Sequence, residues 1–160
     1  MERRDIVIGL VILAVVAAAI FLLRRNPSVP QTSNTTSPTP SAEERLEDAF
    51  KTDIPDDVEK VELRDVANVS ATALATRKWE NGRFEATIMA DLPNPENGFY
   101  QAWIVKDTQF ISLGRMRVAK GGWIIEYQSN TNYSEYDKVV VSLEITNDNK
   151  PEKHIVEGSF

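Results

Sequence analysis

The sequence contains no cysteine and a single histidine, His154. The missing cysteines exclude a disulfide scaffold, a thiol nucleophile, and thiolate ligation of zinc, haem iron or iron–sulfur clusters. One histidine also leaves too few imidazoles for an ordinary histidine-based metal centre. We therefore expect no metal and no cofactor, and most catalytic chemistry is excluded with them.

Positive charge is also scarce, because 18 Lys and Arg residues stand against 24 Asp and Glu residues, for a net charge of −6. A general nucleic-acid binder needs clustered cations in excess to neutralise phosphates, so no nucleic-acid partner is expected. The length of 160 residues leaves room for about one domain of ordinary size beyond any membrane segment.

Residues 6–23 form an uncharged, apolar run of 18 residues. As a helix this run would be about 27 Å long, close to the ~30 Å hydrocarbon thickness of a bilayer. A cleaved signal peptide is the competing interpretation, but the alanines at 17–19 are followed by four more apolar residues, which places a processing site inside the run. A buried helix of a soluble protein is also disfavoured, because the run has no polar face at all. We predict a single transmembrane helix over residues 6–23, after a short cytoplasmic N-terminus, residues 1–5.

Orientation is not decided by charge, because two arginines precede the run and two follow it. Residues 24–41 are rich in Pro, Ser, Thr and Asn, and such a tract cannot bury enough apolar surface to fold. We predict that it is a solvated linker.

Residues 42–57 are predicted to be a short helix followed by an acidic connection. Ser41 and Glu44 have the spacing of a capping box, which satisfies free backbone donors at a helix start. The acidic cluster of Asp53, Asp56, Asp57 and Glu59 lacks the glycine-kinked spacing of a calcium loop. We interpret it as a solvated, charged connection.

From residue 58 onward apolar and polar residues alternate, which is typical of half-buried strands. Asn81-Gly82 is the favoured pair for a two-residue hairpin turn. The predicted strands are 60–66, 70–79, 83–92, 99–106, 109–118, 123–129, 138–146 and 153–159. About eight short strands in some 100 residues predict an all-β domain over residues 58–160, either a β-sandwich or a small barrel, and we favour the sandwich.

Candidate chemistry is sparse in this domain. His154 lies in the last predicted strand and no nucleophile signature accompanies it. Glu126 and Glu144 could serve as paired carboxylates only if they shared a cleft. Arg115 and Arg117 could grip an anion, but exposed strand arginines more often mark a solvent face. We predict that the protein is not an enzyme.

Five aromatic residues could stack on a sugar or pack in the core, and we favour core packing. They are Trp79, Tyr100, Trp103, Trp123 and Tyr127.

A series of short motifs carries a resemblance to a known family. The motifs are Tyr100-Gln101-Ala102-Trp103-Ile104, Ser112-Leu113-Gly114, Val141-Ser142-Leu143-Glu144, Pro151 and Gly158-Ser159-Phe160, with Leu92-Pro93 and Asn97-Gly98 before them. In this order and spacing, over about residues 66–160, they resemble the C-terminal domain of anti-sigma-K factors. The resemblance implies an extracytoplasmic β-rich module joined to one transmembrane helix. For the motif positions we expect structural roles: Tyr100, Gln101, Trp103, Gly114, Leu143, Glu144, Pro151 and Gly158.

The chain also departs from that family. Family members carry a helical sigma-binding domain, often with a zinc-ligand motif, before the membrane helix, whereas only residues 1–5 precede it here. We therefore expect no sigma-factor sequestration in the family's manner. The leading hypothesis is a single-pass membrane protein whose extracytoplasmic module senses or regulates through a protein partner in the cell envelope. The alternative is an envelope carbohydrate-binding or hydrolytic domain that uses surface aromatics and carboxylates.

Overall fold

A computed structural model describes residues 39–160 of the chain. The predicted transmembrane helix at 6–23, and residues 24–38 of the predicted linker, lie outside the described residues. Within residues 39–160 no helix combines the length and the apolar character needed to cross a membrane.

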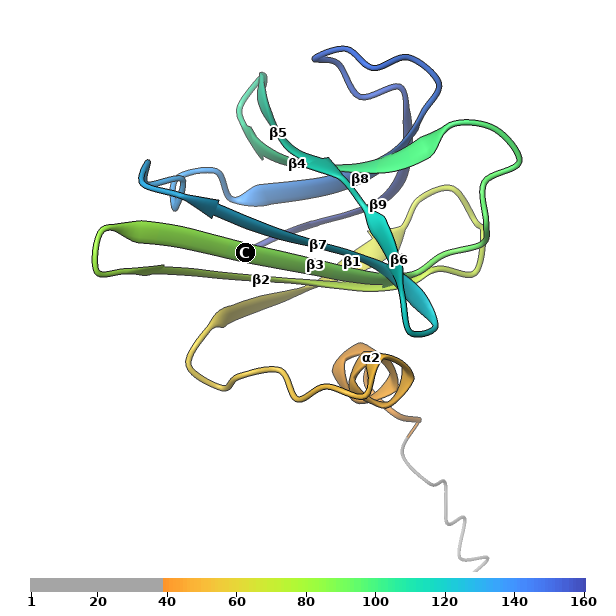
Figure 1. Ribbon diagram of the computed structural model, residues 1–160, viewed down its shortest axis with the longest axis horizontal. Coiled ribbons are helices and arrows are strands. Elements are labelled where there is room, and N and C mark those ends of the chain that lie inside the picture. The colour runs from red at the N-terminus through yellow and green to blue at the C-terminus, as the bar shows by residue number, and fades with distance from the viewer. Residues whose placement is uncertain (1–38) are drawn as a thin grey trace, which may run out of the picture. The chain divides into compact units, whose positions relative to one another are not determined.

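One helix and nine strands make up this region (Figure 1). They are α2 (Ala42–Phe50), β1 (Glu59–Asp65), β2 (Thr72–Glu80), β3 (Arg83–Asp91), β4 (Phe99–Lys106), β5 (Gln109–Arg115), β6 (Arg117–Ala119), β7 (Gly122–Ser129), β8 (Lys138–Glu144) and β9 (Lys153–Ser159). The prediction of an all-β domain is confirmed.

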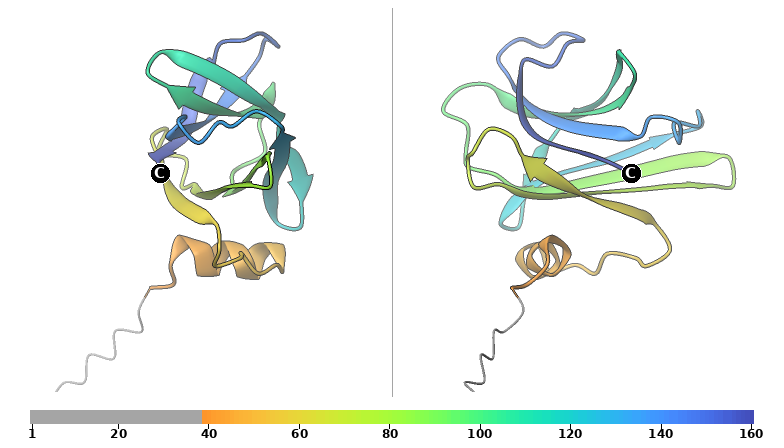
Figure 2. Two further views of the ribbon diagram at one scale, coloured as in Figure 1. Left: turned by 90° about the vertical axis from the view of Figure 1, so that its left-hand side faces the viewer. Right: turned by 180° about the vertical axis from the view of Figure 1, so that it is seen from behind.

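The nine strands form one antiparallel sheet in the order β5-β4-β8-β9-β1-β2-β3-β7-β6. The first half of β1 pairs with β2, whereas Arg64 and Asp65 pair with β9. Because β1 belongs to both halves, the sheet curls over itself into a nearly closed, barrel-like form (Figures 1 and 2). This differs from the favoured sandwich of about eight strands, because a strand shared between two halves was not visible in the alternation.

The predicted strand 109–118 is two strands, and the break is at Met116. Its amide donates a 2.9 Å hydrogen bond to the carbonyl of Tyr100, outside the ladder between β4 and β5. In one continuous strand Leu113 and Met116 would point to opposite faces, yet both are buried in the same core. The chain therefore bends at Met116 and passes from one end of the sheet to the other.

The main core lies inside the curled sheet. Strand β3 contributes Phe84, Ala86, Ile88 and Ala90 to it, so the predicted period-two alternation of this strand is confirmed. Burial of each large apolar side chain of this kind stabilises the fold by about 1.5–3 kcal/mol.

Most of the aromatic residues pack in or against this core. Tyr100 contacts Trp123 edge-on at 5.1 Å between ring centroids, and Tyr127 packs edge-on against Phe84 at 6.5 Å. Trp79 differs from them, because 39% of it is exposed. Core packing therefore accounts for most of the aromatic residues, as predicted from the sequence.

Helix α2 lies outside the curled sheet, next to β2 and β3. Its capping box is present: Ser41 Oγ accepts from the amide of Glu44 at 3.1 Å, and Glu44 Oε2 accepts from the amide of Ser41 at 2.8 Å. Ala42, Leu46 and Phe50 form its buried stripe. The helix ends at Lys51, which adopts a left-handed conformation with φ 52°.

Candidate functional site

The longest motifs from the sequence lie on two neighbouring strands, β4 and β8. Gln101 is directly opposite Ser142, and Trp103 is directly opposite Val140. Directly opposite residues in an antiparallel pair point to the same face, and alternate residues share it. Gln101, Trp103, Ser142 and Glu144 therefore share the face turned away from the main core. We call these four residues the polar layer.

The polar layer contains three of the four buried polar or charged residues in the described region, namely Gln101, Ser142 and Glu144. Hydrogen bonds inside the protein satisfy much of it. Trp103 Nε1 donates to Ser142 Oγ at 2.7 Å, and Gln101 Nε2 donates to Ser112 Oγ at 3.0 Å. A buried polar group without such a partner would destabilise the fold by about 1–3 kcal/mol.

Trp103 is fully buried, but not in the main core. It forms a separate cluster with Val105 and Val140, while its neighbours Ala102 and Ile104 point into the core. Trp103 is therefore buried, as core packing of the aromatic residues predicted, but in a cluster apart from the main core. Alternation along β4 fixes which residues share a face, but both faces of this strand are buried, so the pattern does not say which one meets the core.

Glu144 is 1% exposed and fastens the loop between β8 and β9. Its Oε1 accepts from the amide of Glu152 at 3.0 Å, whereas its Oε2 is buried without a partner among the described residues. The carboxylate of Glu152 accepts in turn from the amides of Ile145 at 2.7 Å and Thr146 at 3.0 Å. The bond from Ile145 contributes most to lowering the pKa of Glu152. Two carboxylates thus hold this loop at both ends, and Pro151 lies within it.

Tyr100 and Leu143 occupy the opposite face of the same strands and belong to the main core, Leu143 at its margin. The Tyr100 hydroxyl donates to the carbonyl of Pro93 at 2.9 Å, which ties the loop after β3 to β4. Burial raises the pKa of Tyr100. This tyrosine is therefore neutral at ordinary pH and acts as a donor.

Gly114 and Gly158, two of the motif glycines, are needed for backbone geometry. Gly114 has φ +119°, a conformation that side-chain-bearing residues rarely adopt, beside an irregularity in the β4–β5 register. At Gly158 an added Cβ would lie 2.7 Å from the carbonyl oxygen of Glu62. Glycine at this position lets β9 approach β1 closely.

The candidate catalytic and anion-binding residues are not brought together. Exposed Glu126 on β7 pairs with Arg117 at 2.5 Å, while Glu144 is buried on β8, which is not a neighbour of β7 in the sheet. The guanidinium of Arg115 lies 3.6 Å from the ring centroid of Phe99. Because the chain bends at Met116, Arg115 and Arg117 belong to different strands.

His154 lies near an acidic residue of its own strand, with Nδ1 3.3 Å from Glu157 Oε2. Glu157 also pairs with Lys138 at 2.7 Å, and this lysine is the main cause of the lowered pKa of Glu157. No hydroxyl or thiol nucleophile accompanies His154 in these contacts.

Lysines pair with two residues of the acidic connection. Asp56 lies 3.5 Å from Lys60, and Asp57 lies 2.7 Å from Lys78. Asp57 is the main cause that raises the pKa of Lys78 to about 12. Within residues 39–160, His, Asp and Glu side chains do not gather in groups of three or more that could hold a metal ion.

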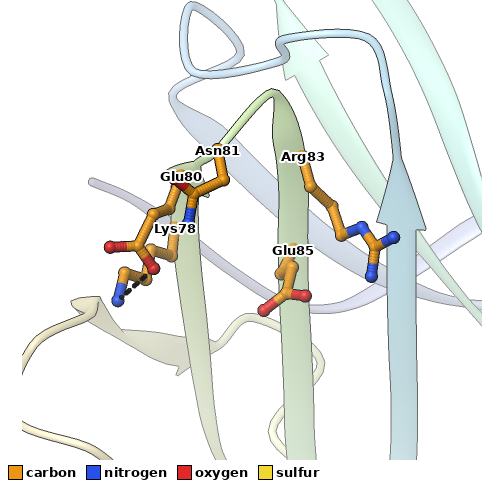
Figure 3. Close-up of a pocket in the computed structure, with 5 residues that line it drawn as sticks. All are labelled: Lys78, Glu80, Asn81, Arg83 and Glu85. Atoms are coloured by element: carbon orange, nitrogen blue, oxygen red, sulfur yellow. Dashed lines mark ion pairs between the residues drawn. The ribbon is translucent and has the colours of Figure 1, made fainter.

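A surface hollow lies at the end of the β2–β3 hairpin and is lined mainly by charged side chains (Figure 3). Lys78 turns toward Glu80, 3.0 Å away, whereas Arg83 extends away from both. The lining residues are Lys78, Glu80, Asn81, Arg83 and Glu85. This mixture of charges defines no single class of ligand.

The polar layer was missed in the sequence, although a signal was present. Gln101 and Trp103 are two residues apart, as are Ser142 and Glu144, so each pair occupies one face of its strand. Only the pairing of β4 with β8 brings the two pairs together.

Comparison with known proteins identifies the family to which this chain belongs. The family model described as anti-sigma-K factor rskA, C-terminal, matches residues 9–155. No curated protein and no solved structure gives a match. The match covers most of the chain and includes every motif residue named above except Gly158, Ser159 and Phe160. The chain therefore belongs to the anti-sigma-K factor C-terminal family.

Proposed function

We propose that this protein is a single-pass membrane protein whose residues 39–160 act outside the cytoplasm as a regulatory protein-interaction module. Family membership supports an anti-sigma-factor-related regulatory role, which implies protein partners. The observation that carries the proposal is the extent of the match, because one family model covers most of the apolar run and most of the barrel-like domain. The run is long enough, at about 27 Å as a helix, to anchor the domain in a bilayer.

The contacts of the motif residues favour a module that works by surface recognition. Gln101, Trp103 and Ser142 are hydrogen-bonded inside the protein, and Glu144 fastens a loop. Because these side chains are used for contacts inside the domain, a partner would contact other residues on its surface. We accordingly assign them structural roles in this proposal.

A hydrolytic or carbohydrate-binding function would need Glu126 or Glu144 in a cleft beside an exposed tryptophan. Glu144 and Trp103 are buried, and Glu126 is engaged with Arg117. Neither carboxylate lines the hairpin hollow or a second hollow between Leu92 and Trp123. Binding to a protein partner is the function we propose.

Protease accessibility tests the anchor and the orientation together. In intact cells that make the full chain with a C-terminal epitope, external protease should remove the epitope. A cytoplasmic protein followed in the same sample should stay intact. Full protection of the epitope until the membrane is permeabilised would contradict the proposed orientation.

A matched variant separates the anchor from the orientation. Val15→Arg places a charge near the middle of the apolar run, where a single arginine opposes insertion by about 2.5–3.5 kcal/mol. This variant should shift from the membrane fraction to the soluble fraction. Equal membrane retention of both proteins would contradict anchoring by residues 6–23.

A further inference from the structure

Helix α2 covers an apolar row on the outer face of the sheet. Leu74, Met89 and Ile124 lie directly opposite one another on β2, β3 and β7. Leu46 and Phe50 of α2 pack on this row, with Ile54 of the following segment. Figure 2 shows the helix lying against the outside of the strands. The row therefore forms a helix-binding surface, which we call the seat.

The rim of this seat is polar, and the contacts fit an acidic helix. Lys60 Nζ lies 2.6 Å from the carboxylate of Glu43 in the first turn of α2. The amide of Ala42 donates to Glu62 Oε1 at 3.3 Å. Gly122 makes room for Phe50, because a Cβ at this position would lie 2.6 Å from the ring. The seat thus selects for an aromatic side chain and an acidic first turn.

Helix α2 packs in a cluster of its own, apart from the main core. The main core contains no residue of α2, since Leu46, Phe50 and Ile54 form a second cluster with Leu74 and Met89. With nine residues, α2 is too short to persist as a helix in water without the sheet. Release of α2 from the sheet would therefore also unwind it, and would remove no residue from the main core.

We propose that α2 is a displaceable latch and that the apolar row beneath it is a docking site for a short acidic amphipathic helix of a partner protein. The bound α2 specifies the chemistry of that partner: a leucine and an aromatic residue four positions apart, with a carboxylate in the first turn to meet Lys60. The partner helix competes with α2 for Leu74, Met89 and Ile124. This inference concerns residues 39–160 and does not depend on the proposed anchor.

A reversible lock tests the latch. An added Cβ at Gly121 would lie 4.0 Å from the Cβ of Ala49, which is within the usual ~3.5–4.5 Å of a disulfide. Because the chain has no cysteine, Ala49→Cys with Gly121→Cys provides the only two thiols. The probe is a fluorescent peptide with the sequence of residues 39–55, added to the full chain in detergent micelles. Gly121→Cys alone is the control for strain at φ +80°.

Binding should depend on release of the latch. The oxidised double variant should bind the peptide at least tenfold more weakly than the same protein after reduction. Leu46→Ala loosens α2 and leaves the apolar row intact, so it should bind the peptide at least tenfold more tightly than the unsubstituted chain. A peptide with Phe50→Asp should not bind.

Two results would overturn the proposal. One is equal binding of the peptide by the oxidised and reduced lock. The other is no binding by Leu46→Ala while its circular dichroism spectrum shows a folded barrel.

Hydrogen exchange gives an independent readout: the amides of α2 should exchange faster than those of β3, and oxidation of the lock should slow only α2. Exchange of α2 and β3 at one common rate would refute a separable latch.

Discussion

The indole of Trp103 donates a 2.7 Å hydrogen bond to the hydroxyl of Ser142 on the neighbouring strand, and both residues are completely buried. This bond lies on the outer side of the curled sheet, away from the main core. The tryptophan therefore has two roles: it fills a small apolar cluster and satisfies a buried hydroxyl. Its contribution to stability can be separated into these two parts.

Truncation of Trp103 should be a severe stability defect. Trp103→Ala removes a fully buried indole, and large aromatic deletions of this kind lower the free energy of unfolding by about 3–5 kcal/mol. Thermal melting monitored by circular dichroism measures the effect. An unchanged melting midpoint would mean that the indole is not buried.

The hydrogen bond itself can be measured with a double-mutant cycle. Ser142→Ala leaves the buried Nε1 without its acceptor and should lower the free energy of unfolding by about 1–3 kcal/mol. In a Trp103→Phe background the same substitution should have a smaller effect, because the donor is already absent. Denaturant unfolding of the four proteins gives the coupling energy. Strictly additive effects would contradict the pairing.

Acid should weaken the loop between β8 and β9. The amides of Ile145 and Thr146 lower the pKa of Glu152 in the folded state. A carboxyl whose folded pKa lies below its unfolded value stabilises the fold at pH above the unfolded value, and this contribution is lost as the pH falls through the folded pKa. The loss therefore begins near the ordinary pKa of 4.5 and continues below it.

Glu152→Gln is the matched control for this pH dependence. The variant should melt at a lower temperature than the unsubstituted protein at pH 7, and the difference between the two should shrink as the pH falls below 4. Melting midpoints measured at several pH values test this. A constant difference across the range would show that Glu152 is not responsible.

Two glycines allow a clean comparison of close packing with backbone strain. Gly158→Ala places a Cβ 2.7 Å from the Glu62 carbonyl oxygen, and the resulting overpacking should destabilise the fold by about 1–3 kcal/mol. It should also weaken the pairing of β1 with β9. At Gly82 an added Cβ would meet no atom within 4 Å, so Gly82→Ala introduces backbone strain alone, at a φ of +76°. Hydrogen exchange of Arg64 and Asp65 amides should therefore speed up in Gly158→Ala and stay unchanged in Gly82→Ala.

The domain should fold without the N-terminal segment. A chain shortened to residues 41–160 keeps the capping box, α2 and all nine strands. Its far-ultraviolet circular dichroism should be dominated by β-structure, with one cooperative melting transition from the barrel. A helix-dominated or unfolded spectrum would contradict this prediction.

Local features of this fold were readable from the sequence because they depend on neighbouring residues. The capping box of Ser41 and Glu44 and the alternation in β3 are of this kind. The division of β1 between two partners and the bend at Met116 depend on residues far apart in the chain. The same is true of the polar layer, whose members were visible separately as motifs. Its existence required the register between β4 and β8.

The topology also has a kinetic consequence. The two ends of the sheet, β5 and β6, are separated in sequence by Met116 alone, so bringing these ends together closes almost no loop. The contact between β1 and β9 closes a loop of about 90 residues, from Asp65 to Val156, and its chain entropy must be lost before the pairing stabilises anything. Folding should therefore be limited by the arrival of β9 at β1, and substitutions at that contact should alter the folding rate more than substitutions around Met116.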